Sequence, residues 1–133
     1  MEKIERILLV DDDNITNFLN VRLIKKLNPD SEIKIANNGE EALAYLHETK
    51  SKHITNPPLI FLDINMPVMN GLDFINTFKN NQSWSRKPVI IVLSSSNNNK
   101  DIQQLQDSKI VSDFLVKPLT AEKVQNVVNK YFS

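Results

Sequence analysis

The chain has 133 residues, of which 41% are hydrophobic, so it is long enough for one core and too short for two domains of ordinary size. Its 16 basic and 16 acidic residues cancel, which gives no reason to expect binding to nucleic acid or to an acidic membrane surface. The absence of cysteine excludes disulfides and thiolate metal sites and agrees with a cytoplasmic location. We expect one domain over residues 1–133.

Four short apolar runs predict buried strands at residues 7–10, 59–62, 89–93 and 114–116. Continuous runs of this length, rich in β-branched residues, are typical of parallel strands that helices cover on both faces. Residues 32–36 alternate between polar and apolar side chains, which is typical of an edge strand. The first run is too short for a signal peptide or a membrane span.

A helix is predicted after the first strand, capped by Asp13 and stopped by Asn28-Pro29-Asp30. Apolar residues recur in it at steps of three and four, which predicts a core-facing stripe of Ile15, Leu19, Leu23, Ile24 and Leu27.

Four more helices follow. The second opens near residues 38–39 and the third at Gly71, while the fourth, around Ile102 and Leu105, is short and polar. The fifth runs from about Thr120, with a predicted buried stripe of Val124, Val127, Val128 and Tyr131.

Five strands that alternate with helices predict an α/β fold, a doubly wound five-stranded parallel sheet with helices on both faces. Parallel strands need crossover connections, and these connections are right-handed. In such sheets ligands bind outside the carboxyl ends of the strands, where the strand order reverses. The residues that follow each strand are therefore the candidates for function.

Polar side chains follow four of the predicted strands. Asp11–Asp13 come after the first strand, Asp63 after the third, Ser94–Ser96 after the fourth and Lys117-Pro118 after the fifth. Each group alone has an ordinary structural explanation as a helix cap, a turn or a strand end. Together they are expected to share one rim of the sheet.

Carboxylates crowded on this rim would repel each other by roughly 4 kcal/mol per pair at about 4 Å and an effective dielectric near 20. A multivalent cation would keep them ionised, and oxygen ligands without nearby His or Cys favour Mg²⁺, with Mn²⁺ as the other choice. Because Mg²⁺ takes one or two protein carboxylates, a third stays free as a nucleophile toward phosphorus. Lys117 and Ser94 would then contact phosphoryl oxygens.

These residues, in this order, resemble the receiver domain of two-component response regulators. The similarity covers nearly the whole chain, through ILLVDDD, LIFLDINMPVMNG, VIIVLSSS and FLVKP. It implies the flavodoxin-like strand order 2-1-3-4-5.

The resemblance also implies roles for individual residues. Asp63 would be the phosphoacceptor, and Asp11 and Asp12 would bind Mg²⁺ together with the backbone carbonyl of Asn65. Asn65 and Ser96 stand where the family tunes the lifetime of its phosphate.

The same resemblance makes Ser94 the switch hydroxyl, with Ser95 as the fallback because one extra residue lies between Pro88 and the switch position. Lys117 would pair with the phosphoryl group, and the Lys117-Pro118 bond is expected to be cis. Phe114 stands at the position of the switch aromatic.

The implied function is a phosphoacceptor signalling switch and not an enzyme. It would take its phosphoryl group from a histidine kinase or a histidine phosphotransfer protein. It would then present the surface of the fourth helix, fifth strand and fifth helix to an unknown downstream protein. We expect no direct contact with nucleic acid or membrane, and a monomer or a phosphorylation-dependent dimer. The initial Met and the end after the fifth helix favour a stand-alone receiver.

Phe18 and Val21 lie beyond the predicted core stripe of the first helix. They are candidates for docking the kinase, and extra core contact is the alternative. His47 and His53 lie away from the rim and are expected to be surface residues.

Two other functions stay open. A Mg²⁺-dependent phosphohydrolase of the haloacid-dehalogenase type also uses an aspartate after a strand, and Asp11 and Asp13 have its Asp-x-Asp spacing. However, Gly-Thr does not follow, and no acidic pair comes after Lys117. The other is a non-switching scaffold, although every reactive position is filled.

Overall fold

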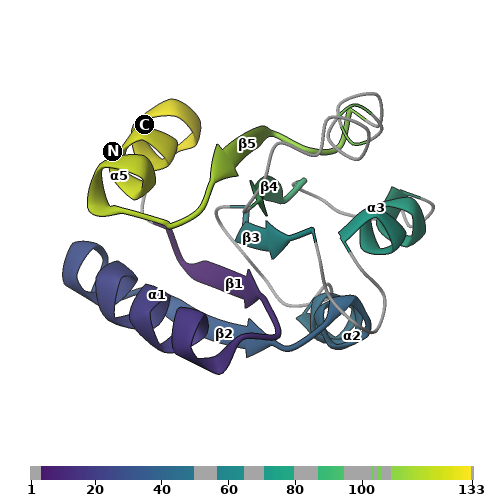
Figure 1. Ribbon diagram of the computed structural model, residues 1–133, viewed down its shortest axis with the longest axis horizontal. Helices are drawn as coiled ribbons and strands as arrows, with labels where there is room; N and C mark the ends of the chain where they lie inside the picture. Colours follow the sequence, from purple (N-terminus) through teal and green to yellow (C-terminus); the bar gives the residue numbers. More distant parts are fainter. Residues whose placement is uncertain are drawn as a thin grey trace.

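The computed structural model describes residues 4–49, 57–64, 71–79, 87–94, 103, 105 and 109–132. Five parallel strands form one sheet in the order β2-β1-β3-β4-β5 (Figure 1). The strands are β1 (Arg6–Val10), β2 (Glu32–Ala36), β3 (Leu59–Asp63), β4 (Val89–Ser94) and β5 (Asp113–Val116). The expected fold class and strand order are confirmed, and β2 is an edge strand as predicted.

Helices cover both faces of the sheet, α1 and α5 on one face and α2 and α3 on the other (Figure 1). They are α1 (Asn14–Leu27), α2 (Gly39–Thr49), α3 (Gly71–Lys79) and α5 (Ala121–Tyr131). In the predicted fourth helix, Gln103 and Leu105 are helical and Leu105 is buried, while Ile102 lies outside the described residues.

The two faces of the sheet carry separate hydrophobic clusters. On β1, Leu8 and Val10 pack on the α2 and α3 side, and Ile7 and Leu9 pack on the α1 and α5 side. Successive side chains of a strand point to opposite faces, so a strand with helices on both sides needs apolar residues at every position. This need explains the continuous runs in β1, β3 and β4.

Helices α1 and α5 begin at capping residues, Asp13 as predicted and Thr120 at the predicted start of the fifth helix. The Asp13 side chain accepts hydrogen bonds from the Ile15 N–H and the Thr16 hydroxyl, at 3.1 and 2.6 Å. The Thr16 bond and then the Ile15 bond lower the pKa of Asp13. Thr120 accepts from the Lys123 N–H at 3.2 Å and caps α5.

The helix α5 has the predicted stripe, with three valines buried and Tyr131 partly buried. At the neighbouring edge of the sheet β5 departs from expectation, because Val116 is exposed. An edge strand has a partner on one side only, and Val116 is its last residue.

The predicted core stripe of α1 is wrong in its first half. Ile15 and Leu19 are 71% and 55% exposed, whereas Ile24 is fully buried as predicted. Leu23 and Leu27 are partly buried against the core.

Polar residues take the inner positions of this half-helix. Asn17 and Asn20 are buried there, and the Asn17 amide donates to the backbone carbonyl of Asp11 at 2.9 Å. The first turns of α1 lie beside the end of β1, so their inner side meets polar backbone rather than the apolar sheet.

Candidate functional site

Three carboxylates meet at the carboxyl ends of β1 and β3. One oxygen each from Asp11, Asp12 and Asp63 lies within 4.8 Å of the others. Val10 of β1 pairs with Leu62 of β3, so the aspartates that follow these two residues are brought side by side. The strand order reverses at this point, because β2 and β3 lie on opposite sides of β1.

Asp11 is held on three sides. Its N–H donates to the Ala36 carbonyl at 3.0 Å, its carbonyl accepts from Asn17, and its Oδ1 accepts from the Asp13 N–H at 2.9 Å. Asp11 and Asp63 are buried, while Asp12 is exposed. Two fixed, buried carboxylates and one accessible one are thus combined in a single cluster.

The Lys117 ammonium lies between the two buried carboxylates. Its Nζ is 2.9 Å from Asp11 Oδ2 and 3.3 Å from Asp63 Oδ1. Burial lowers the pKa of Lys117, but the hydrogen bond to Asp11 and the charges of Asp63 and Asp11 outweigh it, so the pKa lies above its ordinary value. Lys117 therefore stays cationic at neutral pH.

The end of β5 positions this lysine. The Lys117 N–H donates to the Ser94 carbonyl at 2.8 Å, which joins the last residue of β4 to the rim. The Lys117-Pro118 peptide bond is cis, as the resemblance implies. Ser94 is buried and Phe114 packs partly buried on the α2 and α3 side.

Gly71 ties the start of α3 to the end of β3. Its N–H donates to the Ile64 carbonyl at 2.9 Å. A Cβ at this position would lie 2.9 Å from the Ile64 Cα and 3.0 Å from the Asp63 carbonyl oxygen, both of which are backbone atoms. Any side chain here would force these backbone atoms to shift, so the glycine lets α3 start in close contact with the backbone beside Asp63.

The cluster fits a hard divalent cation. Three carboxylates within reach of one point provide the oxygen ligands that Mg²⁺ prefers, and the exposed Asp12 leaves a side open to water. The expected ligand Asn65 lies outside the described residues, as do Ser95, Ser96 and His53.

The residues expected away from the carboxylate cluster differ in their exposure. Phe18 is exposed, and the Arg22 guanidinium carbon lies 5.7 Å from its ring centroid. Val21 packs partly buried against the core, which favours the alternative of an extra core contact. His47 is exposed, as expected.

Sequence reasoning missed Asn17, which holds the Asp11 carbonyl. The signal available was its place six residues after Asp11, on the side of the predicted helix opposite to Ile15. In the first half of the helix the predicted apolar stripe lay on the exposed side, and this hid Asn17.

Comparisons with known proteins agree on one family. The sequence model of the response regulator receiver domain matches residues 7–129. A solved two-component response regulator from Cytophaga hutchinsonii is 37% identical, covers 97% of both chains and has a TM-score of 0.84. The response regulator protein TrrA from Thermotoga maritima, solved in complex with Mg(2+)-BeF, is 28% identical, with 97% of this chain and 100% of that one covered and a TM-score of 0.71.

Curated relatives include proteins longer than this chain. Response regulator Rcp1 from Synechocystis is 33% identical over 72% of this chain and 65% of its own length. The probable C4-dicarboxylate response regulator DctR from Halalkalibacterium halodurans is 30% identical over 98% of this chain but 52% of its own length. The chain thus spans about half of DctR.

No helix in the part of the chain that the structure describes has the length and apolar character needed to cross a lipid bilayer.

Proposed function

Because the chain belongs to the response regulator receiver domain family, we propose that it is a phosphoacceptor switch of a two-component system with Asp63 as the acceptor. The observation that carries the proposal is the ion pair between the Asp63 carboxylate and Lys117, within the same cluster as Asp11 and Asp12. Asp63 ends a strand that is buried at all five positions. A stiff strand holds the nucleophilic oxygen in place for in-line attack.

Asp11, Asp12 and the Asn65 carbonyl would hold Mg²⁺, and Mn²⁺ could replace it. When bound, the ion supplies positive charge to the transferred phosphoryl oxygens. An Asp63 carboxylate oxygen attacks the phosphorus of a phosphohistidine, the P–N bond breaks, and its electron pair stays on the imidazole, which is then protonated. The product is an acyl phosphate on Asp63.

Lys117 and Ser94 would contact the phosphoryl group on Asp63. The Lys117 ammonium already contacts the Asp63 carboxylate at 3.3 Å, so it needs little movement to pair with a phosphoryl oxygen on the same side chain. The Ser94 hydroxyl, or Ser95 as fallback, would bind a second oxygen. Asn65 and Ser96 would tune the lifetime of the phosphate.

The signal would leave through the neighbouring edge of the sheet. Added charge on Asp63 favours the packing in which Ser94 and Lys117 close on the phosphate and Phe114 turns inward, which is a shift between two populations. An edge strand that ends in the exposed Val116 provides surface that a downstream protein can reach. We propose that residues 1–133 form a single cytoplasmic receiver that works without direct DNA or membrane contact, as a monomer or a phosphorylation-dependent dimer.

The phosphodonor would be a histidine kinase or phosphotransfer protein that docks on the exposed side of α1 around Phe18. Truncation by Phe18→Ala is expected to slow transfer from such a protein about tenfold, as for other exposed aromatic anchors. Phosphorylation by a small phosphodonor should not change, because that donor needs no docking surface. Equal slowing with both donors would contradict a docking role.

The proposed acceptor is tested by incubating the protein with phosphoramidate, with and without Mg²⁺, and measuring the mass of the intact chain. We expect one added phosphoryl group in Mg²⁺, none with Asp63→Asn, and retention with Asp13→Asn, whose carboxylate caps α1 outside the cluster. Phosphorylation of Asp63→Asn together with its loss in Asp11→Asn would instead favour the phosphohydrolase. Failure with every small donor, in a folded protein, would favour a scaffold.

A further inference from the structure

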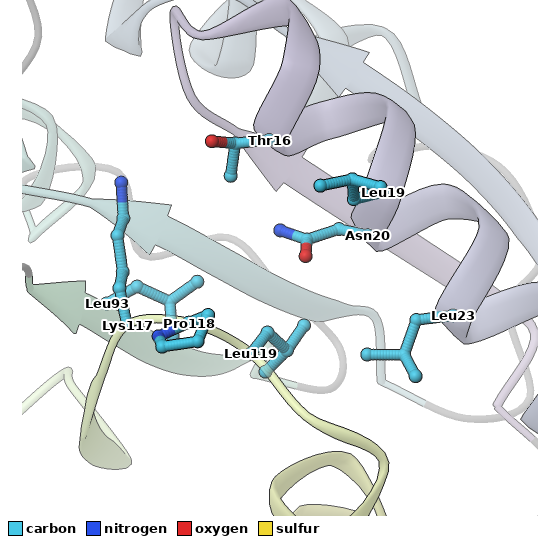
Figure 2. A pocket seen from close by; sticks show the side chains of 8 residues that line it. All are labelled: Thr16, Leu19, Asn20, Leu23, Leu93, Lys117, Pro118 and Leu119. Carbon is cyan, nitrogen blue, oxygen red and sulfur yellow. The ribbon is translucent and has the colours of Figure 1, made fainter.

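A pocket of about 330 Å³ lies between α1 and the segment that connects β5 to α5, next to the proposed phosphorylation site (Figure 2). Most of its wall is apolar and comes from three elements: α1, the end of β4 and the β5–α5 segment. The apolar side chains are Leu19, Leu23, Leu93, Pro118 and Leu119. Pockets of this size and lining are typical binding sites for small molecules.

One amide interrupts the apolar wall. Asn20 is only 8% exposed, and its side chain points from α1 into the pocket, toward Leu93 and Pro118 (Figure 2). Within the described residues, no hydrogen bond to this amide is found. Its polar atoms are not among those that the described residues bury without a partner, so the amide faces the open space of the pocket. The amide is therefore available to hydrogen-bond a molecule that enters the pocket, as donor or as acceptor.

The other polar groups of the pocket are already engaged. The Lys117 ammonium binds Asp11 and Asp63, and its end points away from the leucines of the wall (Figure 2). The Thr16 hydroxyl donates to Asp13 at 2.6 Å. A charged ligand would thus lack an available counter-charge in an apolar wall, which disfavours it.

We propose that this pocket binds a small uncharged molecule, whose apolar body packs on the leucines and whose single amide, carbonyl or hydroxyl group hydrogen-bonds to Asn20. A water molecule takes about 30 Å³ in the liquid, so the pocket has room for about ten non-hydrogen atoms. A ligand of this size is expected to bind with a dissociation constant of about 1 mM. Binding does not require phosphorylation of Asp63.

Hexanamide is a suitable probe, with hexanoate as its charged counterpart. Titrated into ¹⁵N-labelled protein in Mg²⁺, hexanamide should produce saturable amide shifts at Leu19, Asn20 and Leu119. Hexanoate should bind at least about tenfold more weakly, because its carboxylate would be buried without a partner. Absence of saturable shifts with hexanamide at millimolar concentrations would overturn the proposal.

Two kinds of variant distinguish the contribution of the Asn20 amide to binding from that of the cavity. Asn20→Leu should keep the fold, since no protein hydrogen bond is lost, and should weaken hexanamide binding about tenfold. Leu23→Phe, which fills the cavity from its wall, should abolish binding, whereas Lys26→Phe on the exposed side of the same helix should not. Unchanged binding in Asn20→Leu would contradict the role of the amide.

Binding should also persist in Asp63→Asn, which lacks the proposed acceptor. A failure of hexanamide binding is therefore separate from a failure of the proposed phosphorylation. The first would leave the phosphorylation test unchanged, and the second would leave the titration unchanged.

Discussion

The interior of the sheet and its carboxyl-end rim are built from the same strands but bury opposite kinds of side chain. In β3, Leu59, Ile60 and Leu62 are fully buried apolar residues, and Asp63, the last residue of the same strand, is buried and charged. The interior gains stability from burial, whereas charge burial at the rim costs free energy unless it is paired. Substitutions in the interior should therefore change stability, and substitutions at the rim should change chemistry.

The largest effect on stability is expected in the interior. Phe61→Ala removes a fully buried ring from the cluster on the α1 and α5 side, which should lower the free energy of unfolding by about 3–5 kcal/mol. Urea unfolding measures this loss. In the fraction that stays folded, phosphorylation of Asp63 should persist, and its complete loss there would break the division between interior and rim.

A smaller loss is expected where the interior meets the rim. Gly71→Ala places a methyl group against the Ile64 Cα and the Asp63 carbonyl, and should cost about 1–3 kcal/mol because backbone must shift. Since the shift reaches the Asp63 backbone, the rate of phosphorylation should fall as well. A stability loss with an unchanged rate would show that the acceptor does not depend on this contact.

At the rim, Asn17 is expected to act as a positioning residue. Asn17→Ala removes the hydrogen bond to the Asp11 carbonyl, and the affinity for Mn²⁺ should fall about five- to tenfold, the equivalent of one hydrogen bond. Isothermal titration measures it, and Asn20→Ala, one turn away and also buried, is the matched control. If Asn17 has a purely structural role, Asn17→Ala should lower the melting temperature and leave the Mn²⁺ affinity unchanged.

The smallest effect is a pH dependence of stability. The pKa of Lys117 is raised in the folded state above its ordinary 10.5. Its contribution to stability is therefore complete below that value and is lost as the pH rises through the folded pKa. Urea unfolding from neutral pH to above pH 10.5 should show a steeper decline for the wild type than for Lys117→Met. Equal slopes for the two proteins would contradict this, and Lys26→Met, on the exposed side of α1, should behave like the wild type.

The same contrast explains what the sequence could predict. The positions of the buried strands follow from continuous apolar runs. The helix starts at Asp13 and Thr120 follow from side chains that can accept a hydrogen bond from the first turn of the helix. Residues at strand ends could be assigned to one rim because parallel strands end on the same side.

The prediction that failed was the buried face of the first half of α1. Periodicity places apolar residues inside, but near the rim the inner side of the helix meets the Asp11 backbone, so Asn17 is buried and Ile15 is exposed. The sequence predicted that Lys117 lies on the rim and contacts a phosphoryl group, but not its ion pairs with Asp11 and Asp63, because a separation of 106 positions from Asp11 fixes no distance.

The most direct test of the rim is a crystal structure of the protein with Mg²⁺ and beryllium fluoride, which mimics a phosphoryl group. We expect the beryllium fluoride group on an Asp63 oxygen, within hydrogen-bond distance of the Lys117 ammonium and the Ser94 hydroxyl, with the metal on Asp11 and Asp12. Beryllium fluoride on Asp11, or a group on Asp63 that Lys117 does not contact, would contradict it.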